Sequence, residues 1–180
     1  MVIVKLFSLS VLVLAGSSIL GCHNSDTRAD LPSAISYTHA GCFGTCPAYT
    51  IEVDRSGRGT FEGKAFTAAR GTRAFSVTPR QFEDFAAALK PGFRIAKPFN
   101  PKKSLEDQIQ ADFESWCPPD APQHTDDTGV VVIWSGKQSM YLDSYFGCYP
   151  DRDRKLHNAL DEAPNVLGLK NMIGVPRSSP

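Results

Sequence analysis

Cysteine is the residue type in this sequence with the widest range of available chemistry. Cys42 and Cys46 lie four positions apart, whereas Cys117 and Cys148 lie much further along the chain. In an oxidising compartment four cysteines form two disulfides, and three pairings can be drawn. We favour Cys42 with Cys46 and Cys117 with Cys148, because the short spacing lets the first pair close a tight loop. On this interpretation the cysteines have a structural role.

The first pair also suggests a second chemistry. The motif C-x-x-x-C-P resembles the copper-binding motif of periplasmic copper chaperones of the thioredoxin-like class. The thiolates of Cys42 and Cys46 with His39, His124 or His157 would form the soft ligand set that Cu(I) prefers. Those chaperones place the motif at the head of a helix, where the dipole lowers a thiol pKa, whereas here a strand pattern follows. A copper-binding or thiol-redox role is therefore the alternative to the structural one.

The remaining polar residues favour no catalytic chemistry. Asp126 and Asp127 lie in a predicted loop, and the charged residues 151–155 suit the first turn of a helix. The four histidines lack H-x-x-x-H or H-E-x-x-H spacing, and the sequence contains no G-x-S-x-G motif or phosphate-binding glycine loop. We therefore expect a protein that is not an enzyme and that carries no cofactor.

Aromatic residues gather where the last predicted strand ends. The segment 145–150 leaves this strand for a loop and contains Tyr145, Phe146 and Tyr149. An exposed aromatic edge at these three residues would be suited to bind a peptide or a partner protein. The alternative is that the rings belong to the core or to a sheet face.

Strands are indicated by alternation between apolar and polar residues. Residues 48–54 alternate in this way, and residues 55–57 supply a turn into a second strand over 58–63, which makes a hairpin. A third strand is expected at 73–77. The apolar run 130–134 predicts an interior strand, which the turn 135–137 connects to a strand over 138–145. The sequence thus predicts two hairpins.

Helix signals follow each hairpin. Thr78 to Gln81 predicts a helix start with a capping box, and Pro91-Gly92 predicts its end. A second helix is expected from Ser104 and a last one over 151–163, ending at Pro164. The core-facing sides of the first two helices are expected to carry Phe82, Phe85, Ala86 and Leu89, and Leu105, Ile109, Phe113 and Trp116. We predict an α+β fold: an antiparallel sheet built from two β-hairpins with helices packed on one face.

The first residues have the layout of a signal peptide. Lys5 precedes an apolar run from Leu6 to Leu20, which at about 15 residues is shorter than the roughly 20 of a membrane-spanning helix. The run ends on Gly21-Cys22, which resembles the lipobox of bacterial lipoproteins, in which the cysteine receives lipid and becomes the mature N-terminus. A soluble secreted protein cut at a small residue is the alternative. We predict a signal peptide over residues 1–21 and lipidation of Cys22.

The rest of the chain is expected to form one anchored domain. Polar residues 22–34 predict a flexible tether from the lipidated cysteine, and residues 35–175 a single domain. By resemblance to other lipoproteins, His23 in place of a retaining aspartate points to the outer membrane, facing the periplasm. Loss of residues 1–21 leaves 18 Lys and Arg against 19 Asp and Glu, so we expect no nucleic-acid partner. The expected partners are the membrane, through the lipid, and another envelope protein or peptide.

A longer resemblance begins at the first cysteine pair. The chain reads C-F-G-T-C-P-A-Y over residues 42–49 and then D-R-S-G-R-G-T-F-E-G over residues 54–63. These motifs resemble an uncharacterised bacterial domain family that is marked by C-F-G-T-C-P-x-Y, and the similarity covers about residues 36–165. The resemblance implies an exported protein or lipoprotein without an assigned activity. Cys117 and Cys148 are not part of the family's core signature.

Overall fold

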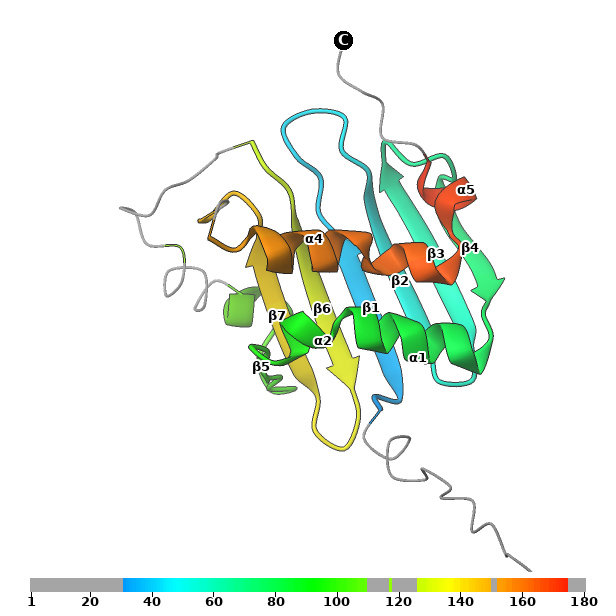
Figure 1. The fold of residues 1–180 in the computed structure, drawn as a ribbon, viewed down its shortest axis with the longest axis horizontal. Coiled ribbons are helices and arrows are strands. Elements are labelled where there is room, and N and C mark those ends of the chain that lie inside the picture. The colour runs from blue at the N-terminus through cyan, green and yellow to red at the C-terminus, as the bar shows by residue number, and fades with distance from the viewer. Residues whose placement is uncertain (1–30, 110–116, 118–125, 150–151, 175–180) are drawn as a thin grey trace, which may run out of the picture.

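A seven-stranded antiparallel sheet, in the order β4-β3-β2-β1-β6-β7-β5, forms the centre of the computed structural model (Figure 1). The structure describes residues 31–109, 117, 126–149 and 152–174. The strands are β1 Ala34–His39, β2 Ala48–Asp54, β3 Arg58–Ala65, β4 Gly71–Ser76, β5 Lys97–Pro98, β6 Gly129–Ser135 and β7 Met140–Tyr145. The helices are α1 Pro79–Ala88, α2 Lys90–Phe93, α4 Arg154–Glu162 and α5 Lys170–Ile173, with a 3-10 helix, η1, at Ala163–Leu167. The predicted α+β class is confirmed.

The strand at the centre of the sheet, β1, was not predicted. It pairs with β2 on one side and with β6 on the other, so it joins the two predicted hairpin regions into one sheet. Ile35, Tyr37 and His39 are buried and alternate with half-buried Ser36 and Thr38, which is the period of a strand with one buried face. The folded part begins slightly before the expected residue 35, because Ser33 already donates a backbone hydrogen bond to Ser135.

Helix α1 covers the sheet as its sequence pattern predicts. Thr78 accepts a hydrogen bond from the Gln81 amide, and the Gln81 side chain accepts one from the Thr78 amide, which completes the capping box. Phe82, Phe85 and Leu89 are fully buried. The Phe85 ring meets the ring of Tyr37 from β1 edge-on, with centroids 6.1 Å apart. The helix is thereby held on the central strand.

The predicted helix ends differ in detail from the structure. Pro91-Gly92 does not end the helical path, because the chain continues as α2, in which Gly92 approaches Leu142 and Leu160 so closely that a Cβ would lie 2.8 Å from each. After α4, Pro164 ends the α-helix and the chain continues as η1. The helix expected from Ser104 does begin there, since Ser104 Oγ accepts from the Asp107 amide; Phe113 and Trp116 lie outside the described residues.

Most of the helical structure lies on one face of the sheet, as predicted, with one exception. Helices α1, α2 and α4 cross the same face (Figure 1). On the opposite face, Tyr141 from β7 is 5% exposed, and its hydroxyl donates to the carbonyl of Gln108 in the helical turn 105–109. This turn therefore covers the β7 side of that face, while Glu52, Thr60 and Glu62 on β2 and β3 remain exposed.

The two ends of the sheet differ, and we name them by their loops. The proximal end carries residues 31–33, 55–57 and 136–139, and the distal end carries loops 40–47, 66–70 and 146–149. Because β1 runs from Ala34 at the proximal end to His39 at the distal end, the start of the described chain and loop 40–47 lie at opposite ends (Figure 1). None of the described helices is long and apolar enough to cross a membrane.

Candidate functional site

The loop between β1 and β2 is closed by a disulfide and presents one aromatic ring to solvent. Cys42 and Cys46 are joined, with their Cα atoms 5.4 Å apart, and the Gly44 amide donates to the Cys42 carbonyl at 2.8 Å. Phe43, at the tip of this tight turn, is 89% exposed. Because the bridged cysteines are only four positions apart, the loop is too short for the Phe43 ring to reach the core. The loop therefore holds an apolar side chain in water at the distal end.

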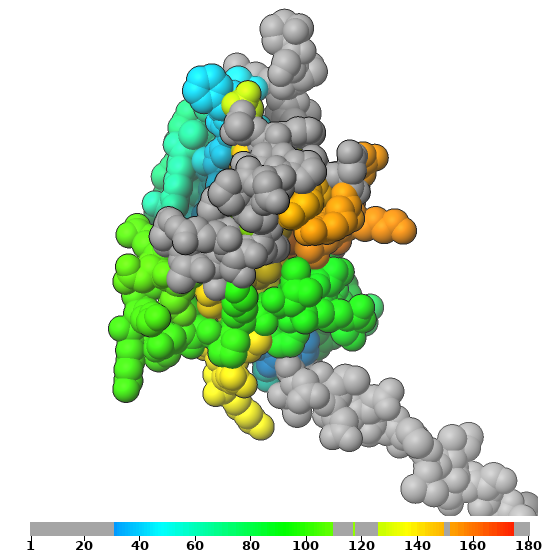
Figure 2. Space-filling model, turned by 90° about the vertical axis from the view of Figure 1, so that its left-hand side faces the viewer, coloured from blue at the N-terminus to red at the C-terminus, as the bar shows by residue number. Residues whose placement is uncertain are grey.

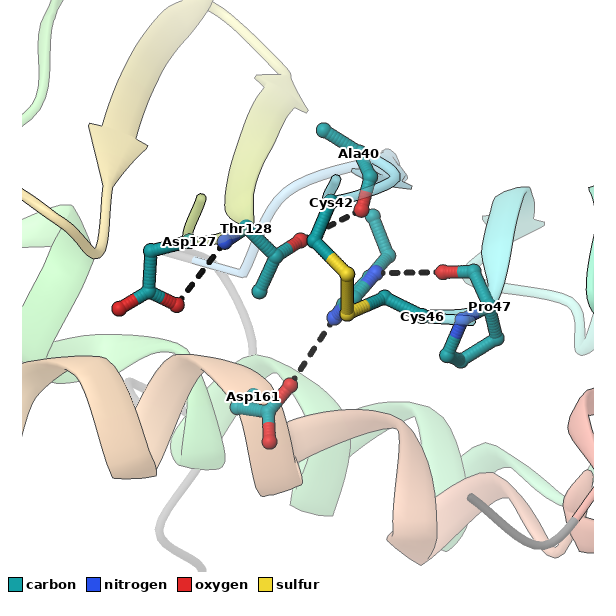
Figure 3. Close-up of a disulfide and its surroundings, with 8 residues drawn as sticks. Ala40, Cys42, Cys46, Pro47, Asp127, Thr128 and Asp161 are labelled. Carbon is teal, nitrogen blue, oxygen red and sulfur yellow. Dashed lines mark hydrogen bonds and ion pairs between the residues drawn. A yellow bond between two sulfur atoms is a disulfide. The ribbon is translucent and has the colours of Figure 1, made fainter. Parts of the chain in front are cut away.

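His39 fastens the base of this loop to helix α4. Its ring is 5% exposed, with Nδ1 2.7 Å from the Pro47 carbonyl oxygen and Nε2 3.1 Å from Asp161 Oδ1 (Figure 3). The ring also stacks on Tyr49, with centroids 5.3 Å apart and an interplanar angle of 6°. Both ring nitrogens therefore lie within hydrogen-bond distance of an oxygen atom, one on the loop and one on α4. His39 thus links the C-x-x-x-C-P motif to a residue 122 positions away.

The other base of the loop is tied to β6. Thr128 Oγ1 donates to the Ala40 carbonyl at 2.5 Å (Figure 3), and the Ala40 amide donates to the Gly129 carbonyl at 2.9 Å. Asp127 accepts from the Thr128 amide at 2.9 Å and fixes the start of that strand. Hydrogen bonds hold both ends of loop 40–47, and the Cys42–Cys46 disulfide closes its middle. The fold therefore fixes the position of Phe43.

Two buried tyrosines, Tyr37 and Tyr49, lie under the candidate site and are neutral. Burial raises the pKa of Tyr37, and Tyr49 and the Asp161 carboxylate raise it further; Tyr37 donates its hydroxyl proton to the Leu160 carbonyl at 3.1 Å. Burial, with the charge of Asp161, also raises the pKa of Tyr49. Both phenols therefore stay protonated at physiological pH. The exposed charged groups at this end are of both signs: Asp126 and the Asp161 side chain, which is 54% exposed, and Arg70 in loop 66–70.

The second disulfide joins Cys117 and Cys148, with Cα atoms 5.7 Å apart. Both cysteines are buried, and Cys148 lies just beyond the end of β7. The two bridges are those that the sequence favoured, so the domain is stabilised by disulfides.

The copper-binding and thiol-redox alternative meets two obstacles in this geometry. The sulfur atoms of Cys42 and Cys46 are bonded to each other, and both nitrogens of His39 already have partners. The chain runs from Pro47 into β2 rather than into a helix. His157 is buried against the Phe146 ring and burial lowers its pKa; His124 lies outside the described residues. No group of three or more His, Cys, Asp or Glu within the described ranges could hold a metal ion.

The predicted aromatic edge is arranged differently from expectation. Phe146 is 7% exposed and belongs to the core, so it offers no exposed ring. Tyr145 and Tyr149 are half-buried, and the Arg152 guanidinium lies 3.7 Å from the Tyr149 ring centroid. The aromatic rings that the distal end does expose are Phe43, at 89%, and Phe66 in loop 66–70, at 54%. The sequence signal of Phe43 is an aromatic residue between two closely spaced cysteines, where a disulfide prevents it from turning inward.

The charged cluster near residue 152 has a local role. Arg152 and Asp153 form an ion pair at 2.6 Å, which lowers the pKa of Asp153. Arg154 and Lys155 follow in the exposed first turn of α4. These residues therefore lie at the start of a helix, as expected, although Asp153, the N-cap residue, makes no side-chain capping hydrogen bond.

The fold and the loop define a class: a disulfide-stabilised α+β domain with one open sheet and a fastened distal loop. The chain belongs to the family described as Domain of unknown function (DUF6438), whose model matches residues 33–164. This confirms the membership of a domain family without an assigned activity. No curated protein and no solved structure matches the chain.

The two disulfides predict the free thiol content of the purified protein. The chain from about Ile35 onward, purified without reductant, should contain no free thiol, and peptide mapping should link Cys42 to Cys46 and Cys117 to Cys148. On the chain-entropy model the closures stabilise by about 2 and about 3.5 kcal/mol, so Cys117→Ala with Cys148→Ala should lower the unfolding free energy more than Cys42→Ala with Cys46→Ala. A stoichiometric Cu(I) complex of the native protein with Cys42 and Cys46 reduced would contradict the structural role.

Proposed function

We propose that this protein is an envelope lipoprotein, anchored through lipid on Cys22, whose domain binds another envelope protein or peptide without catalysing a reaction. The leader and the Gly21-Cys22 pair support the anchor. The disulfides support an oxidising compartment, because such bridges persist outside the cytosol. Residues 1–30 lie outside the described residues, so the anchor rests on the sequence alone.

The single observation that carries the binding role is the exposure of Phe43. An aromatic ring in water is unfavourable by itself, and large aromatic side chains dominate the energetics of protein interfaces. The loop is already ordered by its disulfide and by its hydrogen bonds to Thr128, so little conformational freedom remains to be lost on binding. A fixed, exposed aromatic anchor is what a binding site requires.

The position of the loop suits a partner that lies away from the membrane. Eight residues separate Cys22 from Leu31 and span at most about 28 Å when fully extended. The described chain begins at the proximal end, so an anchor at Cys22 would direct the distal end outward. Because this end exposes charged groups of both signs, among them Asp161 and Arg70, the feature that favours a partner is an apolar pocket for the Phe43 ring.

The binding role predicts a large effect of Phe43→Ala. Affinity purification of the lipidated protein from its own membranes should retain a partner with wild type and with Val166→Ala, a matched change at an exposed apolar residue on η1. For Phe43→Ala we expect at least about thirtyfold weaker binding, the usual size of an interface hot spot. Binding of the recovered partner to the purified variants gives the measurement, and equal affinity of Phe43→Ala and wild type would contradict this proposal.

A copper-binding or thiol-redox protein remains the second candidate. The observation in its favour is that Cys42 and Cys46 are only half-buried, so a reductant could reach the bridge. This function would require the bridge to open and His39 to leave Pro47 or Asp161. The thiol mapping described above separates the two candidates.

A further inference from the structure

The stretch from residue 90 to residue 103 is strongly basic in a chain that is otherwise balanced. It reads K-P-G-F-R-I-A-K-P-F-N-P-K-K, with five Lys or Arg and no acidic residue, whereas the whole chain has 19 of each sign. All five cations are exposed. Phe93 is 44% exposed and Ile95 48% exposed, so apolar side chains reach the surface between the cations. This combination of basic and apolar groups is typical of segments that lie at membrane interfaces.

The fold places this stretch along one side of the proximal end. Strand β5 pairs with the start of β7, at Lys97 with Tyr141 and Pro98 with Met140, and the Phe99 amide donates to the Ser139 carbonyl. Phe93 meets Trp134, near the end of β6, with ring centroids 5.4 Å apart. Figure 2 shows the green residues of this region as a projecting part of the surface.

The point where the chain enters the domain adjoins the same stretch. Arg55 donates to the carbonyl oxygens of Leu31 and Pro32 and so fixes the entry of the chain. A hollow of about 370 Å³ lies between this entry and Phe93, and Lys137 also lines it. The acidic groups near the stretch include Asp54, which pairs with Arg58, Glu106 and Asp107, which follow the stretch, and Asp143 on β7, two residues after the Tyr141 that pairs with Lys97 in the sheet. The proximal surface thus carries an excess of positive charge where the chain leads back to Cys22.

We propose that residues 90–103, with Lys137, form a second membrane contact that lies on an anionic bilayer surface beside the lipid anchor. The orientation rests on the proposed anchoring at Cys22. The cations are attracted to lipid phosphates, and Phe93 and Ile95 enter the interface between head groups and acyl chains. The contact keeps the domain upright on the membrane, so that Phe43 is presented away from the bilayer.

The test uses the mature chain with Cys22→Ser, which carries no lipid, and flotation with vesicles of phosphatidylcholine alone or mixed with an equal amount of phosphatidylglycerol. We expect binding only to the anionic vesicles, and less binding as salt increases. The triple variant Arg94→Ala, Lys97→Ala, Lys102→Ala should bind about a hundredfold more weakly, at about fivefold for each cation.

A matched control keeps the net charge of that variant but removes cations elsewhere. Lys64→Ala, Arg70→Ala, Lys155→Ala should bind as the unsubstituted chain does, and circular dichroism verifies that both triple variants are folded. Absence of binding to anionic vesicles, equal binding to both vesicle types, or equal losses in the two triple variants would overturn the contact. Since the assay contains no lipidated protein, these outcomes leave the anchoring at Cys22 to its own test.

Discussion

Phe85→Ala is expected to lower the free energy of unfolding by about 3–5 kcal/mol. The Phe85 side chain is fully buried between α1 and the sheet, and its ring contacts Tyr37 on the central strand. Truncation of Phe85 removes buried apolar surface and leaves a cavity. The strands of the sheet on one side of this cavity are too rigid to move in and fill it. Because a domain of this size is stabilised by only about 5–15 kcal/mol, the loss should be evident as a lower denaturant midpoint.

Phe43→Ala is the matched control, since it makes the same chemical change at a ring that is 89% exposed. Its unfolding free energy should stay within about 0.5 kcal/mol of wild type. Urea denaturation of both variants with the disulfides intact gives the comparison. A loss below about 1 kcal/mol for Phe85→Ala would mean that α1 does not pack on the sheet as described.

The turn between β2 and β3 shows why a local sequence can predict a turn. Gly57 has a φ of +86°, a conformation that favours glycine. In the same turn Asp54 accepts hydrogen bonds from Ser56 and Arg58, chiefly from the Ser56 hydroxyl, which lower its pKa to about 2. The hairpin of β2 and β3 is therefore determined by nearby residues, and sequence periodicity was sufficient to predict it.

Prediction from local sequence fails for the central strand, β1. Residues 34–39 do alternate, but they follow a polar segment that reads as a tether, and the strand is only six residues long. It pairs with β2 on one side and on the other with β6, which is about a hundred residues away. A local pattern contains no information on such a partner, so the sheet could be predicted as two hairpins but not as one continuous sheet.

Only part of the candidate site could be predicted, because some of its contacts also join residues that are far apart in the sequence. The spacing of Cys42 and Cys46 indicated a closed loop, and the structure has it. The role of His39 depends on Asp161 in α4, which sequence spacing cannot place beside it. Phe146 was expected to be exposed because it follows a strand, yet the chain turns it onto His157 and into the core.

Cys22→Ala should abolish the anchoring of this protein. In the proposed anchoring a thioether-linked lipid is the strongest membrane signal, and a cysteine is required to carry it. In cell fractionation the variant should be recovered in soluble form or as an uncut precursor, whereas wild type should be recovered with membranes. The basic surface at residues 90–103 should retain at most a salt-sensitive fraction, so fractionation is best done in high salt.

The most direct test of the account is the intact mass of the protein extracted from its own membranes. We predict a chain that begins at Cys22 and carries diacylglycerol on its sulfur, with the Cys42–Cys46 and Cys117–Cys148 bridges closed. An unmodified Cys22, or a mature N-terminus elsewhere, would contradict the lipoprotein assignment, and with it the outward presentation of Phe43 on which the binding role depends.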